Sequence, residues 1–167
     1  SVWGRSCVCA LAVVFCFFFF NAAAPTEIYT RSLHDALPIS TAHLFVREGA
    51  KVVLTDIRDE LGERAAVAFR DRGADVLYRH LDVTSEADWK QAVADTLEAY
   101  GRLDILFNNA GIAVPGNIEN LTEETWDREL AVHGKGAFLG PKTPIPAMRR
   151  GRGGLTTGRT SRGQGTG

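Results

Sequence analysis

Cysteine is confined to one short region of this chain of 167 residues. Cys7, Cys9 and Cys16 all lie in the first apolar run, and no cysteine follows them. The absence of cysteine from the rest of the sequence excludes a disulfide framework or metal site there, so we predict no metal ligands. It also suits a reducing compartment, and we expect a cytoplasmic protein.

Glycine and acidic residues are unevenly distributed. No glycine occurs between Gly4 and Gly49, whereas residues 151–167 hold seven glycines and no acidic residue. The formal net charge is −1, which gives no strong attraction to nucleic acid or to an anionic membrane. We therefore predict neither as a partner. Regular amphipathic patterning is concentrated between residues 41 and 148.

The N-terminal segment has an unusual composition. Residues 7–20 are apolar without interruption and follow Arg5, a pattern that imitates a secretory signal but is shorter than the ~20 residues that span a bilayer. However, residues 17–20 are what a poly-T stretch encodes, and residues 26–40 resemble translated sequencing-adapter read-through. We therefore expect residues 1–40 to be a non-native N-terminus. An export signal or membrane anchor, and an unusual genuine N-terminus, are the alternatives.

From Thr41 onward, strand and helix patterns alternate. Apolar or β-branched runs predict strands at 51–55, 75–81 and 103–107. Helices are expected between them, stopped by glycines and begun by the capping residues Thr84 or Ser85 and Thr122. The apolar stripes expected to face the core are Leu61, Ala65 and Phe69; Trp89, Val93, Leu97 and Tyr100; and Trp126, Leu130 and Ala137. Such alternation predicts a parallel sheet covered on both sides.

Each predicted strand ends in a polar or small motif. Ligands of such sheets bind beyond the carboxyl ends of the strands. Asp56 there can accept two hydrogen bonds from vicinal ribose hydroxyls and would repel a 2′-phosphate, which favours NAD over NADP. Asp82 could meet the exocyclic amine of adenine while Val83 packs on the ring. Both aspartates could instead be turn or capping residues.

The third strand leads into Asn108, Asn109, Ala110 and Gly111. The two small residues allow the backbone to approach a ligand closely, and the asparagine side chains can lock neighbouring strand ends by hydrogen bonds. A plain turn is the alternative interpretation. Three such motifs in succession are a better signal than any one alone.

Residues from Thr41 to about Met148 resemble the short-chain dehydrogenase/reductase family. The matching pieces are TAHLFVREGAKVVLTD, LDVTSEADW, YGRLDILFNNAGI and LTEETWDRELAVHGKGAFLG. The resemblance implies a Rossmann-like doubly wound parallel sheet, NAD as cofactor, and hydride transfer between an alcohol and a carbonyl carbon. It also implies a cofactor site in which Asp56 and Ile57 border the adenosine ribose, Asp82 and Val83 the adenine, and Asn109, Ala110 and Gly111 the sugar near the nicotinamide.

The sequence departs from this family before the first matching piece. The family's first strand runs into a glycine-rich turn that holds the pyrophosphate, and no glycine is available for it here. We therefore expect a partial fold in which the first, central strand is missing. Its neighbours would be left with unpaired backbone groups at ~1–3 kcal/mol each. A run such as Ala10 to Phe18 inserted in the gap is the alternative.

The catalytic half of the family pattern is also absent. His133 stands where the family usually has a catalytic Asn, and we interpret it as a helix histidine. Neither Tyr78 nor Tyr100 has the lysine four residues on that the family's catalytic Tyr-x-x-x-Lys pair requires, and the family's Ser has no counterpart. We predict no catalytic residue in this chain, and we expect it to be inactive as it stands.

The C-terminal part loses the pattern altogether. Prolines at 141, 144 and 146 interrupt the last helix beyond Gly140, at ~3 kcal/mol for each interior proline. Residues 149–167 are glycine-rich and aperiodic, and we interpret them as a disordered, frame-shifted tail. The alternative is a nucleic-acid-binding tail that would use Arg149, Arg150, Arg152, Arg159 and Arg162.

These patterns predict residues 41–148 as a partial NAD(P)-binding Rossmann domain. For the complete family enzyme they imply a small-molecule alcohol or carbonyl substrate and the option of a homo-oligomer. Two rival functions are a non-catalytic nucleotide-binding fragment and an exported or membrane-anchored protein.

Overall fold

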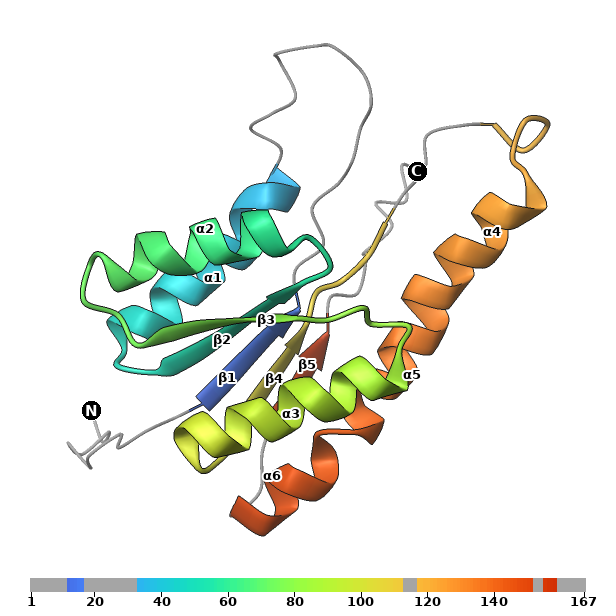
Figure 1. Ribbon diagram of the computed structural model, residues 1–167. Helices are drawn as coiled ribbons and strands as arrows, with labels where there is room; N and C mark the ends of the chain where they lie inside the picture. The colour runs from blue at the N-terminus through green and yellow to red at the C-terminus, as the bar shows by residue number, and fades with distance from the viewer. Residues whose placement is uncertain (1–11, 17–32, 113–116, 152–154, 159–167) are drawn as a thin grey trace, which may run out of the picture.

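A parallel five-stranded sheet forms the centre of the protein (Figure 1). The computed structural model describes residues 12–16, 33–112, 117–151 and 155–158. The strands are β1 (Ala12–Cys16), β2 (Lys51–Asp56), β3 (Val76–His80), β4 (Ile105–Asn108) and β5 (Leu155–Gly158). Their order is β3-β2-β1-β4-β5, and every neighbouring pair is parallel. The predicted α/β, Rossmann-like fold is confirmed.

Helices cover both faces of the sheet (Figure 1). One face carries α1 (Leu33–Arg47) and α2 (Asp59–Arg70). The other face carries α3 (Glu86–Tyr100) and a helical column made of α4 (Glu123–Leu130), the π-helix η1 (Ala131–Lys135), α5 (Gly136–Lys142) and α6 (Ile145–Gly151). Successive strand residues point to opposite faces, so Val52 and Leu54 are buried against α1 and α2. Val53 is buried with the α3 side.

The predicted helix ends are confirmed where local chemistry sets them. Ser85 caps α3 by accepting a hydrogen bond from the Asp88 backbone N–H at 3.3 Å. Thr122 caps α4 through the Thr125 N–H at 3.2 Å. Gly101 closes α3 at φ 73°, a left-handed conformation that glycine adopts without strain. The Ser85 and Thr122 caps fix where two loops of the carboxyl edge end, and Gly101 begins the return to β4 at the opposite edge.

The prediction that the central strand is missing was wrong. We expected it to be missing, but β1 occupies that position and pairs with β2 on one side and β4 on the other. Val13 aligns with Val52 and with Ile105. The alternative expectation, that a run within residues 10–18 fills the gap, is confirmed. The physical reason is that two buried strands with unpaired backbone groups accept an apolar, β-branched segment that pairs with both.

Helix α1 also begins earlier than expected, at Leu33, inside the segment interpreted as a non-native N-terminus. The flanking parts of that segment, residues 1–11 and 17–32, lie outside the described residues. Those interpretations therefore stay predictions, and so does the export signal. What the structure does show is that five residues of the apolar run form a strand of the sheet.

The region after Gly140 is more ordered than the sequence suggested. Pro141 lies within α5, the break comes only at Thr143 and Pro144, and α6 follows. Pro146 lies in the first turn of α6, where its missing N–H is not needed. Strand β5 then pairs with β4, so the expectation of a disordered tail was wrong for residues 155–158. Residues 152–154 and 159–167 lie outside the described residues.

On two helical segments, the residues that are buried differ from the apolar stripes predicted to face the core. Trp126 and Leu130 are 54% and 57% exposed, because α4 projects beyond the sheet (Figure 1). The wider turn of η1 shifts the helical phase, and the column packs instead through Val132, Gly136, Leu139 and Gly140. On α2 the buried face is likewise Gly62, Ala66 and Phe69, which leaves Leu61 39% exposed.

Candidate functional site

The candidate site lies at the carboxyl edge of the sheet, where the parallel strands all end. Strands β2, β3 and β4 deliver Asp56, Asp82 and the Asn108–Gly111 turn to this edge, as the sequence predicted. The end of β1, Cys16, aligns between Thr55 and Asn108. Because all pairings are parallel, these motifs lie along one edge.

Asp56 is the most unusual group of the site. Its side chain is 1% exposed, and Oδ1 accepts a hydrogen bond from the Arg58 backbone N–H at 2.8 Å. The Arg58 Nε lies 3.6 Å from the same oxygen. Oδ2 is buried and has no hydrogen-bond partner within the described part of the chain. Burial raises the pKa of the Asp56 carboxyl above its usual value, and Arg58 offsets part of that effect.

A network beside Asp56 was missed by the sequence reading. The Tyr78 hydroxyl lies 2.7 Å from the Asp56 carbonyl oxygen and 2.8 Å from Asp59 Oδ1. His80 Nδ1 lies 2.8 Å from that same Asp59 oxygen, and its Nε2 lies 3.7 Å from Asp88 Oδ2. Hydrogen bonds from Tyr78 and His80 lower the pKa of Asp59. Burial, followed by the bond to Asp59, raises the pKa of Tyr78.

A sequence signal for this network existed. Tyr78 and His80 are two residues apart on a predicted strand, and therefore lie on one face of it. Asp59 opens the helix that follows Asp56, so the end of β2 and the start of α2 meet this strand face. The network fixes the carbonyl group of Asp56 and the position of the loop that carries Ile57.

Ile57 and Asp82 are less specialised than Asp56. Ile57 is 40% exposed at the rim of the edge. Asp82 Oδ1 accepts hydrogen bonds from both the backbone N–H and the hydroxyl of Thr84, each at 2.8 Å. This is the turn geometry that was the alternative interpretation of Asp82. It occupies Oδ1 with protein partners.

Val83 and the turn after β4 border a cavity of about 220 Å³. Val83 is buried, and its carbonyl oxygen accepts a hydrogen bond from the Trp89 indole at 3.0 Å. The cavity is lined by Val83, Trp89, Asn108, Ala110, Val132, His133, Gly136 and Ala137. Asn109, Ala110 and Gly111 are all half-buried, and Ala110 is the one of the three that lines the cavity. Its size is below the range of ~300–1,000 Å³ usual for sites that enclose a drug-sized ligand.

Small residues hold the helical column against this edge. A Cβ at Gly140 would lie 2.5 Å from Asn108 Oδ1, and a Cβ at Gly136 would lie 2.9 Å from Val83 Cγ2. Glycine is therefore needed at both positions for α5 to approach the strand ends this closely. An ion pair between Glu86 of α3 and Lys142 of α5, with Nζ 3.0 Å from Oε2, also links the two helices.

His133 lies in η1 and is exposed. Its Nε2 is 2.6 Å from the carbonyl oxygen of Ile112. The structure thus brings His133 to the turn after β4, whereas the sequence placed it only on a helix. No group of three or more His, Cys, Asp or Glu side chains suited to a metal occurs among the residues described. No helix in that same part of the chain is long and apolar enough to cross a membrane.

Comparison with known proteins agrees with this architecture. A family profile described as enoyl-(acyl carrier protein) reductase matches residues 37–165. The 2,5-dichloro-2,5-cyclohexadiene-1,4-diol dehydrogenase of Sphingobium indicum is 40% identical over 114 residues, which are 68% of this chain and 46% of that protein. The 3-alpha-(or 20-beta)-hydroxysteroid dehydrogenase of Mycobacterium bovis is 42% identical over 117 residues, or 70% and 44%.

Solved structures share the same fold. A short-chain dehydrogenase/reductase from Burkholderia phymatum, crystallised with NAD, has a TM-score of 0.73 at 21% identity. The match covers 89% of this chain and 48% of that one. The chain therefore spans slightly less than half the length of each of these three proteins.

Proposed function

Because this chain belongs to the short-chain dehydrogenase/reductase family, we propose that it carries the adenosine-recognising part of an NAD-dependent oxidoreductase. The complete protein would transfer hydride between the nicotinamide ring and an alcohol or carbonyl carbon of a small molecule. The observation that carries this proposal is the buried Asp56 carboxylate, whose Oδ2 has no partner among the described residues.

The Asp56 carboxylate fits a ribose. Oδ1 is held by the Arg58 N–H, which fixes the plane of the carboxylate, and Oδ2 is the acceptor left over for a ligand hydroxyl. A buried unsatisfied acceptor costs ~1–3 kcal/mol, so a ligand that donates to it regains that energy. A 2′-phosphate would place negative charge beside this carboxylate, and we therefore propose NAD rather than NADP. Since Asp56 is buried in this structure, binding requires the groups that cover its carboxylate to move.

The residues expected to contact the adenine and the nicotinamide-side sugar suit the cofactor in part. Val83 offers an apolar contact, while Asp82 has one oxygen committed to Thr84 and could use the other. Asn109, Ala110 and Gly111 stand at the edge of β4, where the family resemblance puts the sugar near the nicotinamide. Val83 and Asp82 thus support recognition of the adenosine half, whereas the turn after β4 belongs to the nicotinamide side.

The sequence lacks the turn that would hold the pyrophosphate of the cofactor. Phosphates are held by a glycine-rich turn at a helix N-terminus, and no glycine lies between Gly4 and Gly49. The Tyr-x-x-x-Lys pair is likewise not present in these 167 residues. We therefore propose weak cofactor binding and no turnover for this chain, a nucleotide-binding fragment in its present form. For the whole protein we propose a cytoplasmic location.

Adenosine titration followed by amide NMR tests the proposal. We expect shifts at Asp56, Ile57 and Val83, and their loss in Asp56→Asn. Asp71→Asn is the matched control, because it makes the same charge change at an exposed residue of the α2 end. Shifts that persist in Asp56→Asn, or shifts elsewhere only, would refute the site. Turnover of an alcohol with NAD by this chain would refute the claim of inactivity.

A further inference from the structure

The His133 ring touches two consecutive residues of the turn after β4. Its Nε2 lies 2.6 Å from the Ile112 carbonyl oxygen. A Cβ built on Gly111 would lie 2.9 Å from His133 Cε1, so the ring packs directly on the glycine backbone. A side chain at position 111 would push the ring away, which makes the small residue and the histidine mutually dependent.

The partner atom fixes the chemistry of this contact. A carbonyl oxygen only accepts hydrogen bonds, so His133 Nε2 must carry the proton that it donates. The ring is then the Nε2–H tautomer, and Nδ1 is left as an acceptor.

The backbone supports the ring from behind. His133 belongs to η1, a single π-helical turn, and such turns often occur at functional sites. The preceding residue, Val132, is buried in the core beside Leu139. The turn of backbone that carries the ring is therefore anchored, although the ring itself is exposed.

We propose that His133 is a positioning residue that clamps the Asn109–Gly111 turn through Ile112. In this chain the imidazole thus takes over the place of the Asn that the family resemblance assigns to this helix. The inference rests on the proposed function in one respect, namely that this turn belongs to the cofactor site. The clamp itself is a property of the protein without ligand.

Ring nitrogen NMR and amide hydrogen exchange test the clamp on the full chain. We expect the parent protein to show the Nε2–H tautomer of His133. In His133→Ala, exchange of the Gly111 and Ile112 amides should rise about tenfold, the loss of one hydrogen bond of ordinary strength. His133→Gln should restore slow exchange to within about threefold, because its amide nitrogen is as many bonds from Cα as Nε2 is.

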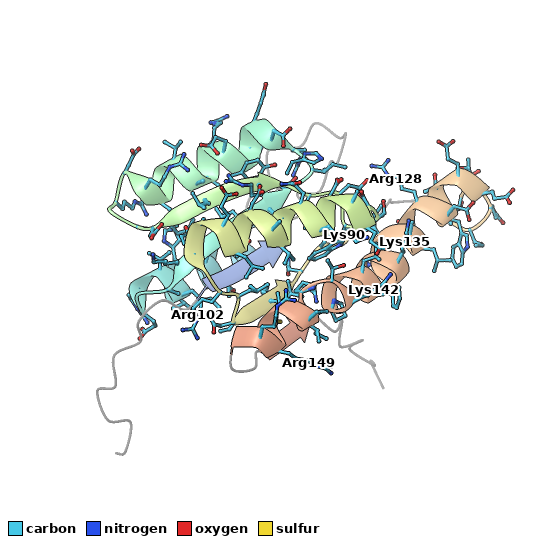
Figure 2. The ribbon with its side chains drawn as sticks, turned by 60° about the horizontal axis from the view of Figure 1, so that its bottom comes forward. Lys90, Arg102, Arg128, Lys135, Lys142 and Arg149 are labelled. Carbon is cyan, nitrogen blue, oxygen red and sulfur yellow. The ribbon has the colours of Figure 1, made fainter. Side chains whose placement is uncertain are left out.

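Lys135→Ala is the control within the same π-helical turn. Figure 2 shows Lys135 on the surface of the helical column, and the residue is exposed. It should leave turn exchange unchanged. A parent with the Nδ1–H tautomer, or equal exchange in the Ala, Gln and parent proteins, would overturn the clamp. If His133→Ala fails to fold, the parent tautomer and the His133→Gln exchange still decide. Loss of adenosine binding with an intact clamp would refute the proposed function alone.

Discussion

The backbone N–H of Arg58 donates to Oδ1 of Asp56 at 2.8 Å and leaves Oδ2 of the same carboxylate buried and unsatisfied by the described residues. A folded protein gains nothing in stability from such an atom. Ligand sites commonly retain groups of this kind at a cost to stability. The relationship between these two residues therefore connects the fold to the proposed function.

Asp56→Asn should reveal the cost of burying this carboxylate as a pH-dependent difference in stability between variant and parent. Burial raises the folded pKa of this carboxyl above its unfolded value of 3.8, so the native state binds more protons in the window above that value. The Asp56 contribution to stability then falls as pH rises through this window. Urea unfolding from about pH 4 to about pH 7 should show the variant gaining stability relative to the parent as pH rises. A stability difference that stays constant with pH, or a variant that loses stability relative to the parent as pH rises, would contradict the buried charge.

Tyr78→Phe should destabilise the protein by about 1–2 kcal/mol. The hydroxyl bonds both the Asp56 carbonyl oxygen and Asp59, and the variant leaves the ring in place. Tyr100→Phe is the matched control, since its hydroxyl bonds Asp75 in an exposed position. Chemical denaturation of the two variants should rank Tyr78→Phe as clearly the more damaging. Equal losses of stability would show that the network beside Asp56 contributes no more to folding than an exposed hydrogen bond does.

Gly62→Ala and Gly134→Ala should change stability in opposite directions. A Cβ at Gly62 would lie 2.0 Å from the Tyr78 ring, which is itself buried, and we expect a loss of about 1–3 kcal/mol. At Gly134 the nearest atom would lie 4.0 Å away, so alanine should stabilise the helical column by about 0.5–1 kcal/mol. Thermal unfolding of both variants gives the comparison. A tolerated Gly62→Ala would mean that α2 does not pack on Tyr78 as described.

Strand β1 should protect its backbone amides from hydrogen exchange. It is paired on both sides, with β2 and with β4. Exchange of the amides of residues 13–15 should be at least ~100-fold slower than in the unfolded chain, because it requires local opening. Exchange at the unfolded rate would show that the strand is not held at the centre of the sheet.

The sequence predicted most of the carboxyl edge because its signals are local. Strand runs, the Ser85 and Thr122 caps and the Gly101 stop each depend on neighbouring residues. Asp56 was correctly placed at the end of β2, but its burial depends on packing from other elements. For Asp82, local chemistry left two interpretations open, and the structure shows the Thr84 turn.

The missed features arise from long-range contacts. Strand β1 was expected only as an alternative, because its pairing depends on two distant strands whose backbone groups the segment Ala12–Cys16 satisfies. Trp126 and Leu130 are exposed because α4 projects beyond the sheet, and the π-helical turn η1 shifts the face of the residues that follow them. The contact of His133 with Ile112 joins residues 21 positions apart in the sequence, beyond the reach of a local pattern.

Calorimetric titration of adenosine and of NAD into this chain tests the central claim most directly. If the chain recognises only the adenosine half, the two ligands should bind weakly, with Kd values within about threefold of each other, because each tenfold gain needs about 1.4 kcal/mol of further contacts. Asp56→Asn should weaken both equally. NAD that binds a hundredfold tighter than adenosine would reveal a pyrophosphate site, and equal binding by parent and Asp56→Asn would contradict the role of Asp56.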